Sequence, residues 1–264
     1  MTTVTVACPF QSSVCVQTED RALLKNLRLK YGQYLLDGDN NKAEFRLCEQ
    51  ENGKYKAIGD GKTIEVDSSL NYISAFLTRT RTFSPKILAL HGAAVAYGGN
   101  AYLFLAPTTG GKTTLTAWLT ERGADYITDD CILINRETLE VYPCTTPIHL
   151  RTGGVTVLRE QNALPEGLEH LDAPGFERWV FTPKNRVSGP VPLGKIYFLS
   201  RTDQNRHVPL SSNDAFIRLL KSPITEYPVT PSHLQIMSRL TTTAPCELQY
   251  RDMTFPEEVL RNKS

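Results

Sequence analysis

The sequence lacks the features that would place it in several large classes of protein. No apolar run approaches the roughly 18 residues of a membrane-spanning helix, and the first residues do not resemble a signal peptide. With 29 Lys and Arg against 28 Asp and Glu, no overall field attracts nucleic acid or an anionic membrane. The six cysteines include no Cys-x-x-Cys pair, which favours reduced thiols over a zinc site. We therefore expect a globular, cytoplasmic protein with neither a nucleic-acid nor a membrane partner.

Two regions with different patterns divide the chain near residue 85. In the first region, short strand-like runs alternate with turn signals such as Glu51-Asn52-Gly53, which predicts a small antiparallel sheet, and a helix is expected over 67–84. In the second region, apolar strand-like runs alternate with helical patterns. The sequence therefore predicts an α/β protein with a small N-terminal α+β domain at 1–85 and a larger domain at 86–264.

The most informative segment is 105–115, which reads Leu-Ala-Pro-Thr-Thr-Gly-Gly-Lys-Thr-Thr-Leu. It lies between a strand-like run and a helical pattern, and a strand, a small-residue loop, Gly-Lys-Thr and a helix are the parts of a phosphate-binding loop. Backbone N–H groups of such a loop wrap nucleotide phosphates, helped by the positive end of the helix. The predicted ligands are ATP and Mg²⁺. The predicted nucleotide-binding residues of the segment are Thr108, Thr109, Gly110, Gly111, Lys112, Thr113 and Thr114.

Two residues of this loop have expected roles, and a third departs from the usual pattern. Lys112 is expected to reach the β- and γ-phosphates, and the Thr113 hydroxyl to ligate Mg²⁺. Ala106 stands where the usual pattern has its first Gly, and Ala fits there only if its φ is negative. The loop therefore predicts nucleotide binding, provided that φ of Ala106 is negative.

Two acidic residues follow the loop in the sequence, at the position where phosphoryl-transfer enzymes carry a metal-binding acid. Asp129 and Asp130 come one short strand after the helix, where an acidic Mg²⁺ ligand is expected. One of them can hold the metal, directly or through water, and the other can accept the proton of an attacking hydroxyl. His91 precedes Gly92 in an apolar strand, where a lone histidine is more often a core residue than a catalyst.

The remaining pattern predicts elements around this site. Residues 159–190 are rich in Pro, Gly and charge without a clear period, which is typical of a functional or mobile loop. Lys195–Leu199 is expected to be a buried strand, and Cys246–Tyr250 a final strand at the edge of a sheet.

The order of these motifs resembles the catalytic domain of the HPr kinase/phosphorylase family. The resemblance rests on Leu90-His91-Gly92, a hairpin, Gly-Lys-Thr, a helix ending in Arg122-Gly123, and Asp129-Asp130. It is specific over about 88–158 and faint through residue 250, and residues 1–85 show no match to that enzyme's N-terminal domain. It implies a phosphate-loop kinase domain of HPr-kinase type. The chain also looks like related kinases of peptide-modification clusters, which phosphorylate a serine of a precursor peptide.

The resemblance also implies roles for individual residues. Asp129 is then the general base, Asp130 helps to hold the metal and His91, and Lys112 serves the phosphates. The resemblance also makes His91 a catalytic residue together with Asp129 and Lys112. The family has an acidic residue two positions before an arginine, and here His149 takes the acidic place while Arg151, a further nucleotide contact, is kept. Loss of that carboxylate puts in doubt a second metal contact and the reverse phosphorolysis of the bifunctional enzyme.

We therefore expect a kinase that transfers the γ-phosphoryl group of ATP to a Ser or Thr hydroxyl of a protein or precursor peptide, in a chain that can form a homo-oligomer. One alternative is a small-molecule kinase related to phosphoenolpyruvate carboxykinase. The sequence contains no His before His91 to supply the metal ligands of such an enzyme. A second alternative is a non-catalytic nucleotide- or peptide-binding module whose N-terminal sheet captures a partner strand at its edge.

Overall fold

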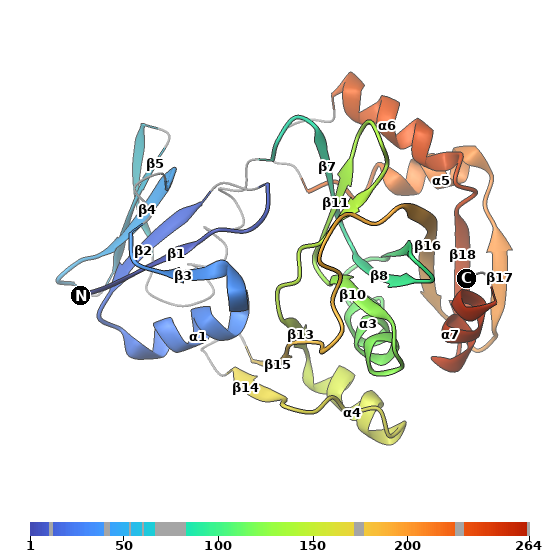
Figure 1. Ribbon diagram of the computed structural model, residues 1–264, viewed down its shortest axis with the longest axis horizontal. Coiled ribbons are helices and arrows are strands. Elements are labelled where there is room, and N and C mark those ends of the chain that lie inside the picture. Colours follow the sequence, from blue (N-terminus) through green and yellow to red (C-terminus); the bar gives the residue numbers. More distant parts are fainter. Residues whose placement is uncertain are drawn as a thin grey trace. The chain divides into compact units, whose positions relative to one another are not determined.

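The computed structural model shows a mixed α/β chain made of two compact units. It describes residues 1–10, 13–39, 43–52, 54–59, 61–66, 83–171, 177–224 and 230–262. The first unit comprises 1–84, 149–152 and 166–182, and the second comprises 85–148, 153–165 and 183–264. Figure 1 shows the elements of both units along the chain.

The first unit is built on a sheet of six described strands in the order β3-β1-β2-β4-β5-β6. The strands are β1 (Thr2–Val6), β2 (Val14–Thr18), β3 (Leu35–Asp37), β4 (Phe45–Glu49), β5 (Tyr55–Gly59) and β6 (Lys62–Val66). Strands β2 and β4 pair in parallel and all the other pairs are antiparallel, so the prediction of an antiparallel sheet is wrong for this pair. The reason is that a helix connects β2 to the strands that follow, and a crossover of that length permits parallel pairing.

That helix, α1 (Arg21–Tyr31), has no counterpart among the sequence predictions. The Asp20 side chain caps it by accepting hydrogen bonds from the backbone N–H groups of Ala22 and Leu23. It ends at Gly32, whose φ of 55° favours glycine. A single face of α1 packs on the sheet and forms the core of the unit. Its buried members include Val4, Val16, Leu23, Leu27, Leu47 and Tyr55.

Two later segments belong to the first unit, although the sequence placed them in the second domain. They contain β13 (Ile148–Leu150), β14 (Glu169–Leu171) and β15 (Arg178–Phe181), which form a sheet in the order β13-β15-β14. Leu171 and Val180 pack in the same core as α1, and this burial holds the segments there. The predicted structureless loop at 159–190 therefore contains two strands. The helix predicted at 67–84 lies mostly outside the described residues.

The second unit has a central sheet in the order β10-β8-β9-β16-β18-β17 and a smaller one in the order β12-β11-β7. The strands are β7 (Ile87–His91), β8 (Ala93–Tyr97), β9 (Asn100–Leu105), β10 (Asp125–Thr128), β11 (Cys131–Asn135), β12 (Val141–Tyr142), β16 (Leu193–Arg201), β17 (Arg206–Pro209) and β18 (Cys246–Tyr250). The helices are α3 (Lys112–Glu121), α4 (Thr152–Glu160, which begins in the first unit), α5 (Ser212–Leu219), α6 (Pro231–Thr241) and α7 (Thr254–Arg261).

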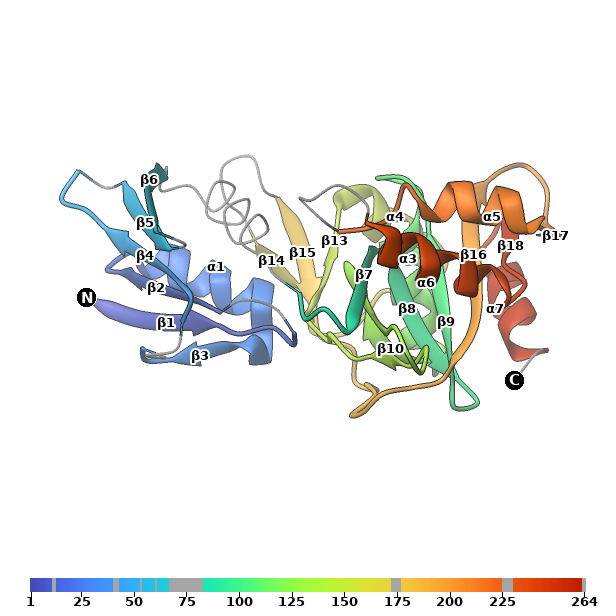
Figure 2. The ribbon, with the colours of Figure 1, turned by 90° about the horizontal axis from the view of Figure 1, so that it is seen from above.

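Both faces of the central sheet are covered. One face packs on the small sheet and on α5 and α6, through a core that includes Leu90, Leu103, Ile132, Ile196, Leu219 and Met237. Helix α3 contacts β8 and β10, and α7 contacts β18; Figure 2 shows α5 and α6 in front of β16. Strand β9 pairs in parallel with β16, and β16 with β18, so these three strands end at the same edge of the sheet.

Two predictions for this unit need correction. The segment from Ile87 to Ala96 is not one strand, because Gly92 separates β7 from β8 and the two belong to different sheets. Strand β18 lies inside the sheet, and the outer strand is β17, whose exposed and polar sequence gives a weak strand signal. All six cysteines are free thiols.

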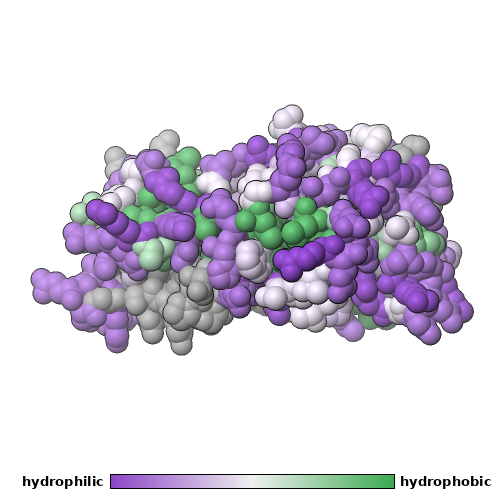
Figure 3. Space-filling model, turned by 90° about the horizontal axis from the view of Figure 1, so that it is seen from below, coloured by the Kyte–Doolittle hydropathy of each residue, from purple (hydrophilic) through white to green (hydrophobic). Residues whose placement is uncertain are grey.

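The surface is mostly hydrophilic on the face drawn in Figure 3, with apolar residues gathered in smaller areas. None of the helices in the described ranges has both the length and the apolar character needed to cross a membrane.

Candidate functional site

The predicted phosphate loop connects β9 to α3 in the second unit. Strand β9 ends at Leu105 and α3 begins at Lys112, with Gly111 as its N-terminal cap in the left-handed region at φ 87°. Ala106 is not among the described residues with positive φ, so the backbone meets the condition that its side chain imposes. The loop therefore has the strand–turn–helix context that a phosphate-binding loop requires.

The loop is tightly folded and holds a residue in an uncommon conformation. Thr109 has φ 67°, which is unfavourable for a β-branched side chain. At Gly110, a Cβ would lie 2.6 Å from the Cβ of Ala106 and 3.0 Å from the carbonyl oxygen of Pro107. Gly110 N–H donates to that Pro107 oxygen at 3.0 Å. Backbone strain in a loop at a helix N-terminus is typical of ligand-binding sites.

Lys112 turns back into the loop. Only 7% of its surface is exposed, and its Nζ donates hydrogen bonds to the carbonyl oxygens of Ala106 at 2.7 Å and Pro107 at 3.3 Å. Burial lowers the pKa of the ammonium group, and the charges of Asp129 and Asp130 partly offset that effect. The loop carbonyls thus hold the ammonium group inside the loop.

Asp129 follows β10 and is the most perturbed carboxylate of the site. Its Oδ1 is buried and has no hydrogen-bond partner in the described part of the chain. Burial and the neighbouring charge of Asp130 raise its pKa well above the usual range, while a hydrogen bond from the Thr113 hydroxyl and the charge of Lys112 oppose the rise. A carboxylate in this environment has a raised affinity for a proton.

His91 ends β7 beside Asp130. Its Nδ1 lies 3.4 Å from Oδ1 of Asp130, both side chains are about half exposed, and the Gly92 N–H donates to the Asp130 carbonyl oxygen at 3.3 Å. Gly92 has no room for a side chain, because a Cβ there would lie 2.6 Å from Ile132, 2.7 Å from Leu105 and 2.8 Å from the Phe104 oxygen. The core thus fixes the turn that carries His91.

The structure gathers most of the predicted residues in one place. Lys112 and Thr113 interact with Asp129, and His91 with Asp130. Thr108 and Thr109 are exposed in the loop, and Thr114 lies half-buried in the first turn of α3. Arg151 belongs to the first unit. There the burial of Arg178 lowers the pKa of that residue, and the nearby charge of Arg151 lowers it further. His149, in the position of the family's acidic residue, also lies in the first unit.

Comparison with known proteins assigns no family. No protein-family model and no curated protein matches this chain. What the site can do is therefore argued from its own groups.

Those groups are of the kinds that attract anions and hard cations. A helix N-terminus and Lys112 offer positive charge to phosphate. Two carboxylates and a hydroxyl beside them are hard oxygen donors, the kind that Mg²⁺ prefers. Two further residues at this edge, Tyr250 and Arg201, lie beside Gly111 and had no sequence signal except their place at the ends of strands. The arrangement therefore places a buried ammonium group, a helix N-terminus, two carboxyl groups and a hydroxyl group close together.

Proposed function

We propose that the chain is a kinase that transfers the γ-phosphoryl group of ATP to a Ser or Thr hydroxyl of a protein or peptide. We further propose that its second unit is a phosphate-loop domain of HPr-kinase type. The observation that carries the proposal is Asp129, a half-buried residue whose Oδ1 is buried without a hydrogen-bond partner in the described residues and whose carboxyl pKa is raised, beside Thr113 and Lys112. Perturbed carboxylates of this kind are concentrated at catalytic sites.

The loop and α3 bind the donor in this proposal. The N–H groups at the start of α3 hold the phosphates, and Lys112 leaves the carbonyls of Ala106 and Pro107 for phosphate oxygens. Lys112 is expected to prefer phosphate oxygens to the two carbonyl oxygens because the phosphates carry full negative charge. Lys112 thus stabilises the charge that develops on the transferred group.

The residues fit a magnesium ion, since Asp129 Oδ1 has no partner and the Thr113 hydroxyl and Asp130 lie near it. Thr113 and Asp130 would hold the ion, which would neutralise phosphate charge when bound. His91 restrains the Asp130 carboxylate at 3.4 Å. It is therefore assigned a role in holding that carboxylate in place.

Asp129 takes the proton in the transfer step. The acceptor oxygen forms a bond to the γ-phosphorus as the bond from that phosphorus to the β–γ bridging oxygen breaks, and ADP leaves. The hydroxyl proton passes to the Asp129 carboxylate. Its raised pKa gives it a higher affinity for this proton than an ordinary carboxylate has.

The test uses γ-labelled ATP, Mg²⁺ and candidate acceptors that contain Ser or Thr. We expect the label to appear on a hydroxyl with the wild-type chain. Asp129→Asn is expected to retain ATP binding and to lose transfer by ~10²–10⁴-fold, the usual contribution of general acid–base catalysis. Asp125→Asn, at the exposed start of the same strand, is the matched control and is expected to keep the wild-type rate.

Two results would contradict the proposal. Unchanged transfer by Asp129→Asn would remove Asp129 as the base. Nucleotide binding without transfer to any hydroxyl, protein or small-molecule, would favour a non-catalytic module instead.

A further inference from the structure

Arg201 and Tyr250 lie beside the phosphate loop at the edge where the parallel strands end. They are the last residues of β16 and β18 and are direct partners in the register of that pair. Because β16 also runs parallel to β9, both residues emerge at the edge where β9 enters the loop. Ligands of open α/β sheets bind at this edge.

Tyr250 contacts the cap of α3. A Cβ at Gly111 would lie 2.8 Å from the Tyr250 Oη and 4.0 Å from Cγ and Cδ of Arg201. Tyr250 is fully buried, and its Oη has no hydrogen-bond partner of ordinary geometry in the described part of the chain. Burial raises the pKa of this phenol, and the nearby Arg201 partly offsets the rise. The buried Tyr250 hydroxyl therefore faces the start of α3 with the Arg201 side chain beside it.

Arg201 stacks on this tyrosine. Its guanidinium carbon lies 5.1 Å from the centre of the Tyr250 ring, within the range of a cation–π contact. Arg201 is exposed, and no carboxylate in the described ranges forms an ion pair with it. The ring thus holds a free positive charge in one orientation next to Gly111.

The charges of the site indicate where the Arg201 guanidinium could bind. Lys112 is the one cation of the loop segment 105–115, and Asp129 and Asp130 place negative charge beside it. A nucleotide triphosphate brings several more negative charges. A guanidinium binds phosphate oxygens through two parallel hydrogen bonds, and one already ordered by a ring loses less entropy in doing so.

We propose that Arg201, oriented by Tyr250, is a phosphate-binding residue of the nucleotide site, contributed by β16 rather than by the loop. This inference rests on the proposed nucleotide-binding function. Tyr250 acts as a positioning residue through its ring, and Gly111 is required because any side chain there would displace the tyrosine.

The experiment measures binding of MgATP and of inorganic triphosphate, a probe that lacks the nucleoside. Arg201→Gln is expected to weaken both by about 10–100-fold, the loss expected for charge-assisted hydrogen bonds. Arg201→Lys keeps the charge without the paired donors and is expected to show a smaller loss. Arg122→Gln is the matched control, since Arg122 also stacks on an aromatic ring, that of Trp118, at the other end of α3.

Tyr250→Phe separates the ring from the hydroxyl. It keeps the cation–π contact and is expected to bind both ligands within about twofold of wild type. A loss as large as that of Arg201→Gln would assign the phosphate contact to the hydroxyl and overturn the proposal. Thermal unfolding of each variant shows whether a loss of binding reflects a loss of folding.

The outcomes distinguish the two levels of inference. If wild type binds MgATP and Arg201→Gln binds it equally well, the role of Arg201 is overturned and the proposed function stands. If folded wild type binds neither ligand, both are overturned. A loss confined to the Arg201 variants supports the proposal.

Discussion

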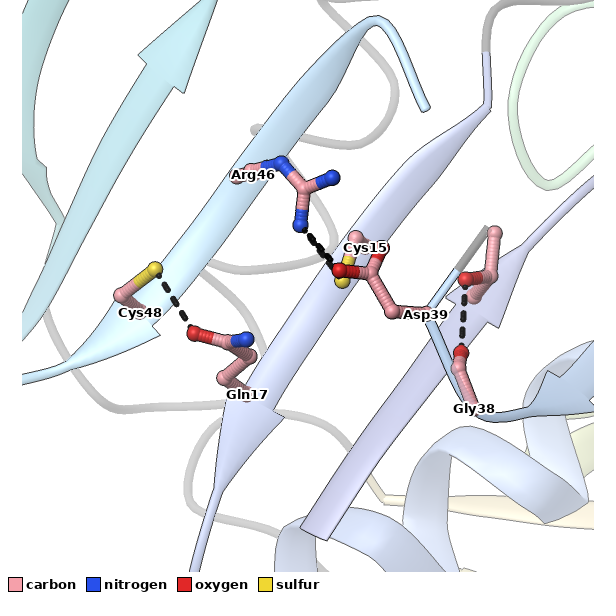
Figure 4. Close-up of polar contacts among 7 residues, drawn as sticks. Cys15, Gln17, Gly38, Asp39, Arg46 and Cys48 are labelled. Carbon is pink, nitrogen blue, oxygen red and sulfur yellow. Dashed lines mark hydrogen bonds and ion pairs between the residues drawn. The ribbon is translucent and has the colours of Figure 1, made fainter. Parts of the chain in front are cut away.

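The two units differ in how completely their polar groups are paired by hydrogen bonds near the residues compared below. On the sheet of the first unit, Arg46 donates to Asp39 at 2.7 Å and to the Cys15 sulfur at 3.8 Å, and the Cys48 thiol donates to Gln17 at 3.2 Å (Figure 4). Each group in this network has a partner. Such pairing is what a folded surface requires, and it accounts for these residues without any ligand.

In the second unit, some buried polar atoms next to the loop have no hydrogen-bond partner among the residues that the structure describes. They include Asp129 Oδ1 and the Tyr250 hydroxyl oxygen. The contrast is clearest between two carboxyl groups, because a hydrogen bond from Arg46 lowers the pKa of Asp39 while burial raises that of Asp129. The pairing with Arg46 accounts for Asp39 as a structural residue, whereas Oδ1 of Asp129, buried without a partner in the described residues, marks a place where a ligand is expected.

The first prediction concerns two glycines that have no room for a side chain. In Gly110→Ala the new Cβ meets Ala106, so the loop must shift, and we expect MgATP affinity to fall by between about tenfold and 100-fold, the cost of overpacking. Gly59→Ala, whose Cβ would meet the Phe45 ring in the first unit, is expected to lower stability and leave affinity unchanged. Isothermal titration and thermal unfolding check both. An equal loss of MgATP affinity in Gly110→Ala and Gly59→Ala would contradict the assignment of the nucleotide site to the second unit.

The second prediction concerns the pH dependence of stability. Because the pKa of Asp129 is raised in the folded state, the folded chain binds more protons than the unfolded one above about pH 4, and this residue's contribution destabilises the fold as pH rises. Asp129→Asn removes this effect. We expect the variant to be more stable than wild type by about 1–2 kcal/mol at pH 8, the range for a buried polar group without a partner, and equal to it below pH 4.

Asp39→Asn is the matched variant in the first unit and should show the opposite sign. The lowered pKa of Asp39 stabilises the fold above about pH 4, and that contribution is lost as pH falls. The variant is thus expected to be less stable than wild type at neutral pH, with the difference vanishing in acid. Urea unfolding at several pH values measures the stability of both variants relative to wild type. Stability differences of the same sign in Asp129→Asn and Asp39→Asn would contradict the comparison.

The smallest expected effect comes from the strained threonine of the loop. Thr109→Gly removes a side chain at φ 67° and is expected to raise the free energy of unfolding by about 1 kcal/mol, the lower part of the range for such strain. Its neighbour Thr108 has no positive φ, so Thr108→Gly is expected to lower stability slightly through backbone entropy. The reverse order in thermal unfolding would show that the loop is not strained.

Local signals were enough to predict the elements around the site. The strand before the loop, the helix after it and the short strand before Asp129 were all predicted, because apolar periodicity and turn residues act over a few positions. Sequence order also suggested that His91, Lys112 and the Asp pair are neighbours, and the fold brings them together.

Features that depend on distant pairing could not be predicted. The parallel pairing of β2 and β4, the position of β18 inside the sheet and the joining of β14 and β15 to the first unit are all set by packing across the chain. Arg201 and Tyr250 were missed for the same reason. They lie far from the loop in sequence, and only the parallel register of β9, β16 and β18 places them beside it.

The turn at Gly92 ties the chemistry of the second unit to its hydrophobic interior. Leu105, Ile132 and the Phe104 backbone surround this glycine and leave no space for one more carbon atom. A change in the volume of either aliphatic side chain would therefore shift the turn that carries His91 without a substitution at His91 itself. The packed interior around Gly92 therefore sets where this histidine lies, and a substitution in that interior can move the histidine from a distance.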